Sequence, residues 1–165
     1  MTDAQLLEKV KRGWRCDETP CGHGSTITET ESVRRVLPKL VRDYKIKTVS
    51  DAGAGDLHWM RLVRWEVYYA GYDLYPRHPN VTQFDITKEV LPKSDMILCR
   101  HVLNHLSIQY SERALDNFRA SGSTYLLMTN CDTQRDYWTQ YGLSIGEPLE
   151  SWNDSTKWEL ELYSL

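Results

Sequence analysis

The stretch TVSDAGAGDLHWM, residues 48–60, places a Gly-x-Gly turn directly after a short β-branched run. Glycine-rich turns between a strand and a helix typically bind phosphates. This turn carries an aspartate on each side, because Asp51 precedes Gly53 and Asp56 follows Gly55. Two carboxylates repel a pyrophosphate and attract a ligand with positive charge. The stretch therefore indicates a strand-end site for a cationic ligand.

The two standard phosphate-binding motifs do not fit this turn. A dinucleotide-binding turn has a third glycine three residues after the second, and His58 occupies that position. The lysine of a Walker motif is also missing after the turn. Neither a dinucleotide nor a nucleoside triphosphate is the expected ligand.

Five short apolar runs have the composition of β-strands and occupy residues 47–52, 68–74, 81–86, 95–100 and 124–130. Helical spacing predicts a helix over residues 57–66, and a short helix followed by a longer one over residues 101–122. Strands that alternate with helices form parallel sheets with right-handed crossovers. The predicted fold class is α/β, a doubly wound Rossmann-like sheet.

The two ends of the chain add to this pattern. An amphipathic helix is expected over residues 26–44, with Thr28 and Glu31 as a capping box and Pro38 kinking or splitting it. Residues 141–165 contain two extended stretches around the turn-forming NDS of residues 153–155, which predicts an antiparallel hairpin at one sheet edge.

At 165 residues the chain fits one domain. We interpret residues 1–25 as an N-terminal lead-in and possible lid, within which any disorder is expected, and residues 26–165 as the core. The crossover between the third and fourth strands, TKEVLPKS, is too short for a full helix, and the segment after the fifth strand, CDTQRDYWTQY, is also reduced.

S-adenosylmethionine is a cationic ligand of the required kind, with a sulfonium, an ammonium and no phosphate. Asp51 is expected to bind the ammonium, while Gly53 and Gly55 let the main chain approach the ligand. Asp73 follows Asp51 by 22 residues, where a carboxylate accepts hydrogen bonds from ribose hydroxyls. Asp85 ends the third strand and could accept from the adenine amino group, or it could cap the segment that follows it.

These residues resemble the motifs of the class I S-adenosylmethionine-dependent methyltransferases. SDAGAGDLHWM is similar to their first motif, YDLY to the second, FDI to the third and DMILCRHVLNHLS to the fourth. CGHGST, residues 21–26, resembles a segment of a small bacterial and bacteriophage group. The resemblance covers residues 21–165. It implies the strand order 3-2-1-4-5-7-6 with an antiparallel seventh strand, and cofactor binding that includes Leu74 and Ile86.

Two histidines are candidates for the reacting side of the site, and two further residues are candidates for cofactor binding. His101 and His105 follow the fourth strand, and either could remove a proton from an acceptor or contact it. Alternatively, both histidines pack the loop. Arg100 could contact the cofactor or an anionic substrate, or form a surface ion pair. Trp59 could contact adenine.

Composition and charge limit the kinds of partner that the chain is expected to bind. A formal net charge of −3 and a pI near 5.9 argue against non-specific nucleic-acid binding, although residues 1–50 hold ten Lys and Arg against seven Asp and Glu. The N-terminus does not resemble a secretory signal, and no window reaches the roughly 18 apolar residues of a membrane span, so a cytoplasmic location is expected.

The four cysteines are too few and too scattered for a disulfide framework and are expected to be thiols. Zinc ligation by Cys16, Cys21 and His23 is not favoured, because the four-residue gap is unusual and a fourth ligand is missing. The His101 and His105 pair lacks both the glutamate of a zinc-protease helix and a third ligand. We expect no metal site.

The leading hypothesis is methyl transfer from S-adenosylmethionine to a small-molecule acceptor. A nucleic-acid acceptor is possible but less favoured, because the fourth strand is not followed by a DPPY-type tetrapeptide. The alternatives are another chemistry with the same cofactor, such as a lyase or a different transferase, and an interaction module without cofactor.

Overall fold

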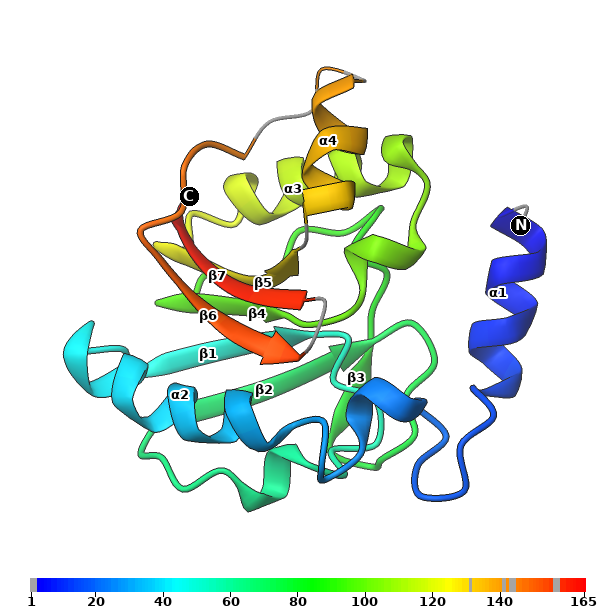
Figure 1. The fold of residues 1–165 in the computed structure, drawn as a ribbon, viewed down its shortest axis with the longest axis horizontal. Helices are drawn as coiled ribbons and strands as arrows, with labels where there is room; N and C mark the ends of the chain where they lie inside the picture. The colour runs from blue at the N-terminus through cyan, green and yellow to red at the C-terminus, as the bar shows by residue number, and fades with distance from the viewer. Residues whose placement is uncertain (1–2, 131, 141, 143–144, 156–157) are drawn as a thin grey trace.

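The computed structural model describes residues 3–130, 132–140, 142, 145–155 and 158–165. Within these ranges, seven strands form one sheet in the order β3-β2-β1-β4-β5-β7-β6 (Figure 1). They are β1 (Thr48–Ala52), β2 (Tyr68–Asp73), β3 (Val81–Gln83), β4 (Met96–Cys99), β5 (Tyr125–Asn130), β6 (Glu150–Ser155) and β7 (Trp158–Ser164). β1 to β5 pair in parallel, and β7 runs antiparallel to both β5 and β6. The predicted fold class, strand order and C-terminal hairpin are confirmed.

Helices cover both faces of the sheet. The helix α2 (Glu31–Asp43) lies on one face, and α3 (Ile108–Ala120) and α4 (Asp132–Gln140) lie on the other (Figure 1). The strands at the centre of the sheet supply both cores, because successive side chains point to opposite faces. Met96 and Leu98 of β4 pack on the α2 side, and Ile97 and Cys99 pack on the α3 side. Among the described residues, no helix is long and apolar enough to cross a membrane.

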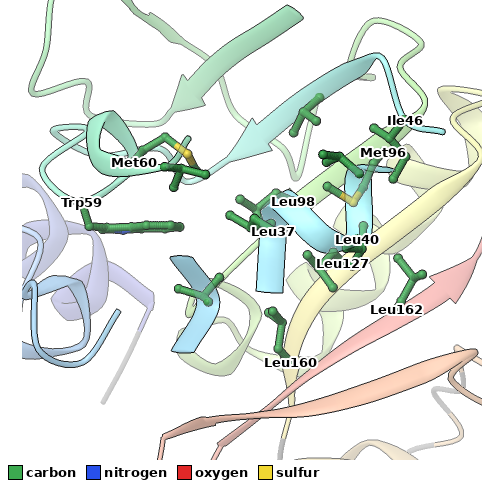
Figure 2. Close-up of a cluster of buried hydrophobic side chains, with 14 residues drawn as sticks. Leu37, Leu40, Ile46, Trp59, Met60, Met96, Leu98, Leu127, Leu160 and Leu162 are labelled. Atoms are coloured by element: carbon green, nitrogen blue, oxygen red, sulfur yellow. The ribbon is translucent and has the colours of Figure 1, made fainter. Parts of the chain in front are cut away.

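The segment between β1 and β2 departs from the expected helix. It forms only the 3-10 turn η2 (Met60–Leu62), and Leu57 has a left-handed backbone with φ 58°. A left-handed residue interrupts a right-handed helix at its first turn. Trp59 and Met60 instead close one end of the core under α2, opposite Ile46 and Met96 (Figure 2). Tertiary packing of these large side chains prevails over the weak helical pattern.

The helix α2 begins later than the sequence pattern indicated. Its N-cap is Thr30, which makes no side-chain cap bond, and Thr28 contributes only its carbonyl to the Glu31 amide at 3.2 Å. The predicted capping box is therefore wrong. Pro38 lies inside an uninterrupted helix and does not split it. Burial of neighbouring apolar residues such as Leu37 offsets the cost of the proline.

Two other expectations change in detail. Residues 153–155, expected as the hairpin turn, belong to β6. The short helix after β4 is the 3-10 turn η3 (Leu103–His105), which precedes α3 as predicted. The short crossover after β3 contains no helix.

The N-terminal segment contains a helix that the sequence pattern did not predict. The helix α1 (Asp3–Arg12) stands beyond the carboxyl ends of β1 and β2 (Figure 1). Arg77, in the loop after β2, donates to the carbonyls of Val10 at 2.6 Å and Lys11 at 3.1 Å. A guanidinium at these last carbonyls satisfies acceptors that the helix itself leaves unpaired. Arg77 thus attaches α1 to the core.

Candidate functional site

A pocket of about 480 Å³ lies between α1 and the carboxyl ends of β1, β2 and β4. Doubly wound sheets bind ligands at this edge. The pocket is lined by nine of the eleven residues that the sequence nominated: Gly53, Gly55, Asp73, Leu74, Asp85, Ile86, Arg100, His101 and His105. The other two, Asp51 and Trp59, are not among the lining residues. The structure thus assembles most of the predicted site around one cavity.

The glycine turn is required by the protein's own packing. Gly53 has φ 102°, and a β-carbon there would overlap Val102 Cγ2. Gly55 has φ 59°, and a β-carbon there would overlap the thiol of Cys21. The two glycines therefore let the loop after β4 and the N-terminal segment approach the end of β1.

Asp73 ends β2 and faces the pocket. Its Oδ2 accepts the Gly55 amide and its Oδ1 accepts the Tyr75 amide, each at 2.9 Å. Burial raises the pKa of Asp73, and the two amide bonds lower it in part. A carboxylate has about four acceptor positions. Two remain for hydroxyl groups of a ligand.

Asp85 lies two residues beyond the end of β3 and takes the capping role that the sequence left open. It caps the segment after β3, because Oδ1 accepts from the Thr87 amide at 3.0 Å and from its hydroxyl at 2.6 Å. Lys88 lies 2.8 Å from Oδ2. Burial opposes ionisation, but the bonds to Lys88 and Thr87 outweigh it and lower the pKa of Asp85. The residue also lines the pocket beside Ile86.

Asp51 lies beneath the turn, within the core. The Tyr69 hydroxyl donates to its Oδ2 at 2.5 Å. Burial raises the pKa of Asp51 to about 7, although the Tyr69 bond and the charge of Arg100 act in the opposite direction. Trp59 is also buried, and the Arg100 guanidinium lies over its ring at 5.6 Å. Both residues can influence the pocket through Arg100.

A buried ionic cluster of Arg100, His101 and Asp154 lies beside the pocket, just after the end of β4. Arg100 donates through Nε to Asp154 Oδ1 at 3.1 Å, and its Nη2 lies 2.9 Å from Oδ2. Arg100 Nη1 donates to the Gly24 carbonyl at 2.6 Å. The imidazole Nε2 of His101 lies 3.1 Å from Asp154 Oδ2. Arg100 is therefore an internal anchor and not a surface ion pair.

His105 has a different environment from His101. Its ring stacks against Trp14 with 4.6 Å between centroids, and the Lys9 ammonium lies 4.2 Å from the Trp14 ring. Burial lowers the pKa of His105 to about 4, with smaller contributions from His101 and Lys9. The two histidines do not share a helix face, since His101 has φ 53° and only His105 lies in η3.

The segment of residues 19–25 folds over the pocket and is attached to the turn after β1. Asp56 accepts the Thr19 hydroxyl at 2.8 Å and the Cys21 thiol at 3.4 Å, so it anchors this segment. Residues 21–25 line the pocket. Burial raises the pKa of Cys21 to about 11, which keeps it a thiol.

Cysteine and metal chemistry can be checked over the part of the chain that the structure describes. Cys16, Cys21 and Cys99 are free thiols, as expected, and Cys131 lies outside the described residues. Within the same ranges, no three His, Cys, Asp or Glu side chains converge closely enough to hold a metal ion.

Sequence reasoning missed three residues of the site. Asp154 lies 53 residues beyond its partner His101, and Trp158 meets the His101 ring edge to face at 5.1 Å. Trp14 reaches the pocket from the N-terminal segment. No local pattern marks these contacts, because each joins segments that only the finished fold brings together.

No family model matches the chain, and no curated protein sequence matches it. The fold of the chain is nevertheless similar to those of solved methyltransferase structures.

The magnesium protoporphyrin IX methyltransferase ChlM from Synechocystis PCC 6803, crystallised with bound S-adenosylmethionine, superimposes with a TM-score of 0.59 at 12% identity, over 99% of this chain and 91% of that chain. The N-methyltransferase NodS from Bradyrhizobium japonicum WM9 gives a TM-score of 0.59 at 14% identity, over 86% and 98%. The methyltransferase domain of bacterial CtHen1 gives 0.60 at 12% identity, over 85% and 100%. At these identities the likeness establishes the fold.

Proposed function

We propose that this chain binds S-adenosylmethionine in the pocket beneath α1 and transfers the methyl group to a small acceptor. The observation that carries the proposal is the Asp73 carboxylate, fixed by two backbone amides beside the glycine turn, with acceptor positions left toward the pocket. The volume of about 480 Å³ is within the range typical of small-ligand sites. The residues present fit an adenosyl ligand.

Each part of the cofactor would contact a different set of pocket residues. Asp73 and Leu74 would hold the ribose, and Asp85 and Ile86 would hold the adenine. The turn from Gly53 to Gly55, with Arg100 behind it, would hold the methionine portion, while Asp51 and Trp59 act from beneath through Arg100. When bound, the cofactor supplies a methyl group activated by its sulfonium.

The chain's own residues then orient the acceptor, exclude water and take up a proton. His101 and His105 are the candidates for proton uptake on the pocket wall. His105, with a pKa near 4, is neutral at pH 7 and a weak base. The helix α1 and residues 19–25 serve as the lid, which favours a small acceptor over a polymer.

Calorimetry with S-adenosylhomocysteine and S-adenosylmethionine tests binding. Both compounds should bind and raise the melting temperature, and Asp73→Asn should weaken S-adenosylhomocysteine binding about tenfold or more, since it loses charged acceptors. Asp116→Asn, which removes an exposed acid on α3, is the matched control and should bind normally. If neither compound binds the unaltered protein, the proposal is wrong.

Product analysis tests the reaction. The protein is incubated with S-adenosylmethionine alone and then with fractionated small-molecule extracts. S-adenosylhomocysteine should form only when an acceptor fraction is present. Consumption of the cofactor without any acceptor would instead support lyase-type chemistry in the same pocket.

A further inference from the structure

The contact between Asp154 and His101 joins the C-terminal hairpin to the loop after β4. We propose that Asp154 is a positioning residue that holds His101 as the base of the reaction, and that the acceptor is therefore a hydroxyl or amine that loses a proton. This inference rests on the proposed function and names its substrate class.

Asp154 occupies an irregular position in its strand. Asn153 pairs with Glu159 and Ser155 pairs with Trp158, so Asp154 is the extra residue of a β-bulge. Bulges re-aim side chains and are common beside active sites. The Asp154 side chain is fully buried and points at Arg100 and His101. The bulge thus directs the Asp154 carboxylate toward Arg100 and His101.

Arg100 keeps that carboxylate ionised. Burial opposes its ionisation, but the hydrogen bonds and charges of His101 and Arg100 outweigh burial and hold the pKa of Asp154 below its ordinary value. An ionised carboxylate only accepts hydrogen bonds. Its bond to His101 at 3.1 Å therefore requires a proton on Nε2. In the neutral ring this leaves Nδ1 unprotonated.

His101 is held in place from several sides. Its backbone has φ 53°, a left-handed conformation that strains a non-glycine residue. The His101 amide donates to Thr129 Oγ1 at 2.7 Å, and Trp158 meets the ring edge to face. The His101 side chain remains 19% exposed on the pocket wall. Within the described part of the chain, Nδ1 of His101 has no hydrogen-bond partner.

This arrangement has a definite chemical use. The acceptor's oxygen or nitrogen forms a bond to the methyl carbon, the carbon–sulfur bond breaks with its electron pair going to sulfur, and the acceptor's proton passes to Nδ1 of His101. The resulting imidazolium is stabilised by the Asp154 carboxylate. A thiolate or a thioether has no proton to lose and would gain nothing from the pair.

Imidazole nitrogen NMR of the unaltered protein with S-adenosylhomocysteine tests the pair directly, with the His101 signals assigned from His101→Gln. At pH 8, Nε2 should carry the proton and Nδ1 should be bare. In Asp154→Asn the proton should move to Nδ1, because Arg100 holds the amide oxygen and the amide NH2 then faces Nε2. A proton on Nδ1 in the unaltered protein, or a proton that stays on Nε2 in the variant, would overturn the inference.

The His101 tautomer in the spectrum of the unaltered protein tests the inference even if Asp154→Asn does not fold. Asp116→Asn is the charge-matched control and should leave the His101 tautomer unchanged. If S-adenosylhomocysteine binds but the tautomer is the other one, only this inference fails. If S-adenosylhomocysteine does not bind, the proposed function itself fails.

Methyl-labelled S-adenosylmethionine with phenol, aniline and thiophenol as probes gives a second readout. Transfer to phenol or aniline should fall about 10²-fold in His101→Gln and at least about tenfold in Asp154→Asn. Transfer to thiophenol, which is ionised at pH 8, should stay unchanged. Unchanged transfer to phenol or aniline in both variants would contradict the inference. If none of the probes is methylated, the tautomer measurement decides alone.

Discussion

Two parts of the pocket are built in different ways: the cofactor wall around Asp73 and Asp85, and the acceptor wall around Arg100, His101 and Asp154. The wall proposed for the cofactor uses contacts close in sequence, because Asp73 accepts from Tyr75 two residues away and Asp85 from Thr87 two residues away. The wall proposed for the acceptor uses distant segments. Arg100 meets Asp154 across 54 positions and Gly24 across 76. The first wall is specified by strand ends, and the second exists only in the finished fold.

The difference also concerns energy. The cofactor wall consists of partly solvated carboxylates that satisfy nearby amides, and each such bond contributes modestly. The acceptor wall contains a buried ion pair, in which each charge depends on the other. A substitution in the acceptor wall should therefore cost more stability than one in the cofactor wall.

The largest expected effect is that of Arg100→Met. It leaves the Asp154 carboxylate buried without its main partner, so the free energy of unfolding should fall by about 3–5 kcal/mol. Urea denaturation measures the loss. The double variant Arg100→Met with Asp154→Leu should recover most of the stability, because neither charge then remains. A double variant as unstable as the single one would show that the ion pair is not the cause.

The next effect is that of Gly53→Ala on the cofactor side. The new β-carbon would overlap Val102 in a backbone conformation of φ 102°, so a loss of about 2–4 kcal/mol is expected. Gly142→Ala is the matched control, because Gly142 also has positive φ but nothing within 4 Å. The control isolates the backbone cost, and adding Val102→Ala should recover the remainder. A loss equal to that of the control would remove the packing argument.

The contrast explains what the sequence could predict. The sheet order, the glycine turn, Asp73 and Asp85 all follow from strand ends and short spacings. The structure confirms the sheet order, and the turn glycines, Asp73 and Asp85 line one pocket. Asp154 could not be found in this way, since a β-bulge and a distant hairpin position it. The helix α1 was also missed, because its placement depends on Arg77 and not on its own pattern alone.

One prediction failed because a tertiary contact prevailed over a local preference. The apolar residues after the turn have partly helical spacing, yet Trp59 and Met60 pack into the core without a helix. A sequence pattern predicts which residues are buried more reliably than it predicts the backbone conformation around them.

Asp51 belongs to the cofactor wall by sequence and to the core by structure. Its pKa of about 7 lies above the ordinary value of 3.8, so the folded chain binds more protons between these pH values, and stability should fall as pH rises from 4 to 7. Asp51→Asn should remove this dependence and raise the free energy of unfolding at pH 8 by about 1–3 kcal/mol. Thermal unfolding from pH 4 to 8 measures it, and an unchanged pH profile would place the titration elsewhere.

The smallest expected effect on stability is that of Arg77→Ala, which tests whether the proposed lid helix α1 opens independently of the core. Arg77 holds α1 through the Val10 and Lys11 carbonyls, and these bonds are partly exposed, so the loss should be below about 1 kcal/mol. Amide hydrogen exchange should quicken over residues 3–14 while the central strands keep their protection.

Ligand dissociation from the same variant tests whether α1 controls access to the pocket. S-adenosylhomocysteine should dissociate several-fold faster from Arg77→Ala, because α1 and Trp14 line the pocket and the variant loses the bonds that hold α1. Arg64→Ala, at an exposed arginine outside the pocket lining, is the control. If dissociation stays unchanged while exchange over residues 3–14 quickens, then α1 opens without gating the pocket, and the cofactor wall alone determines ligand residence.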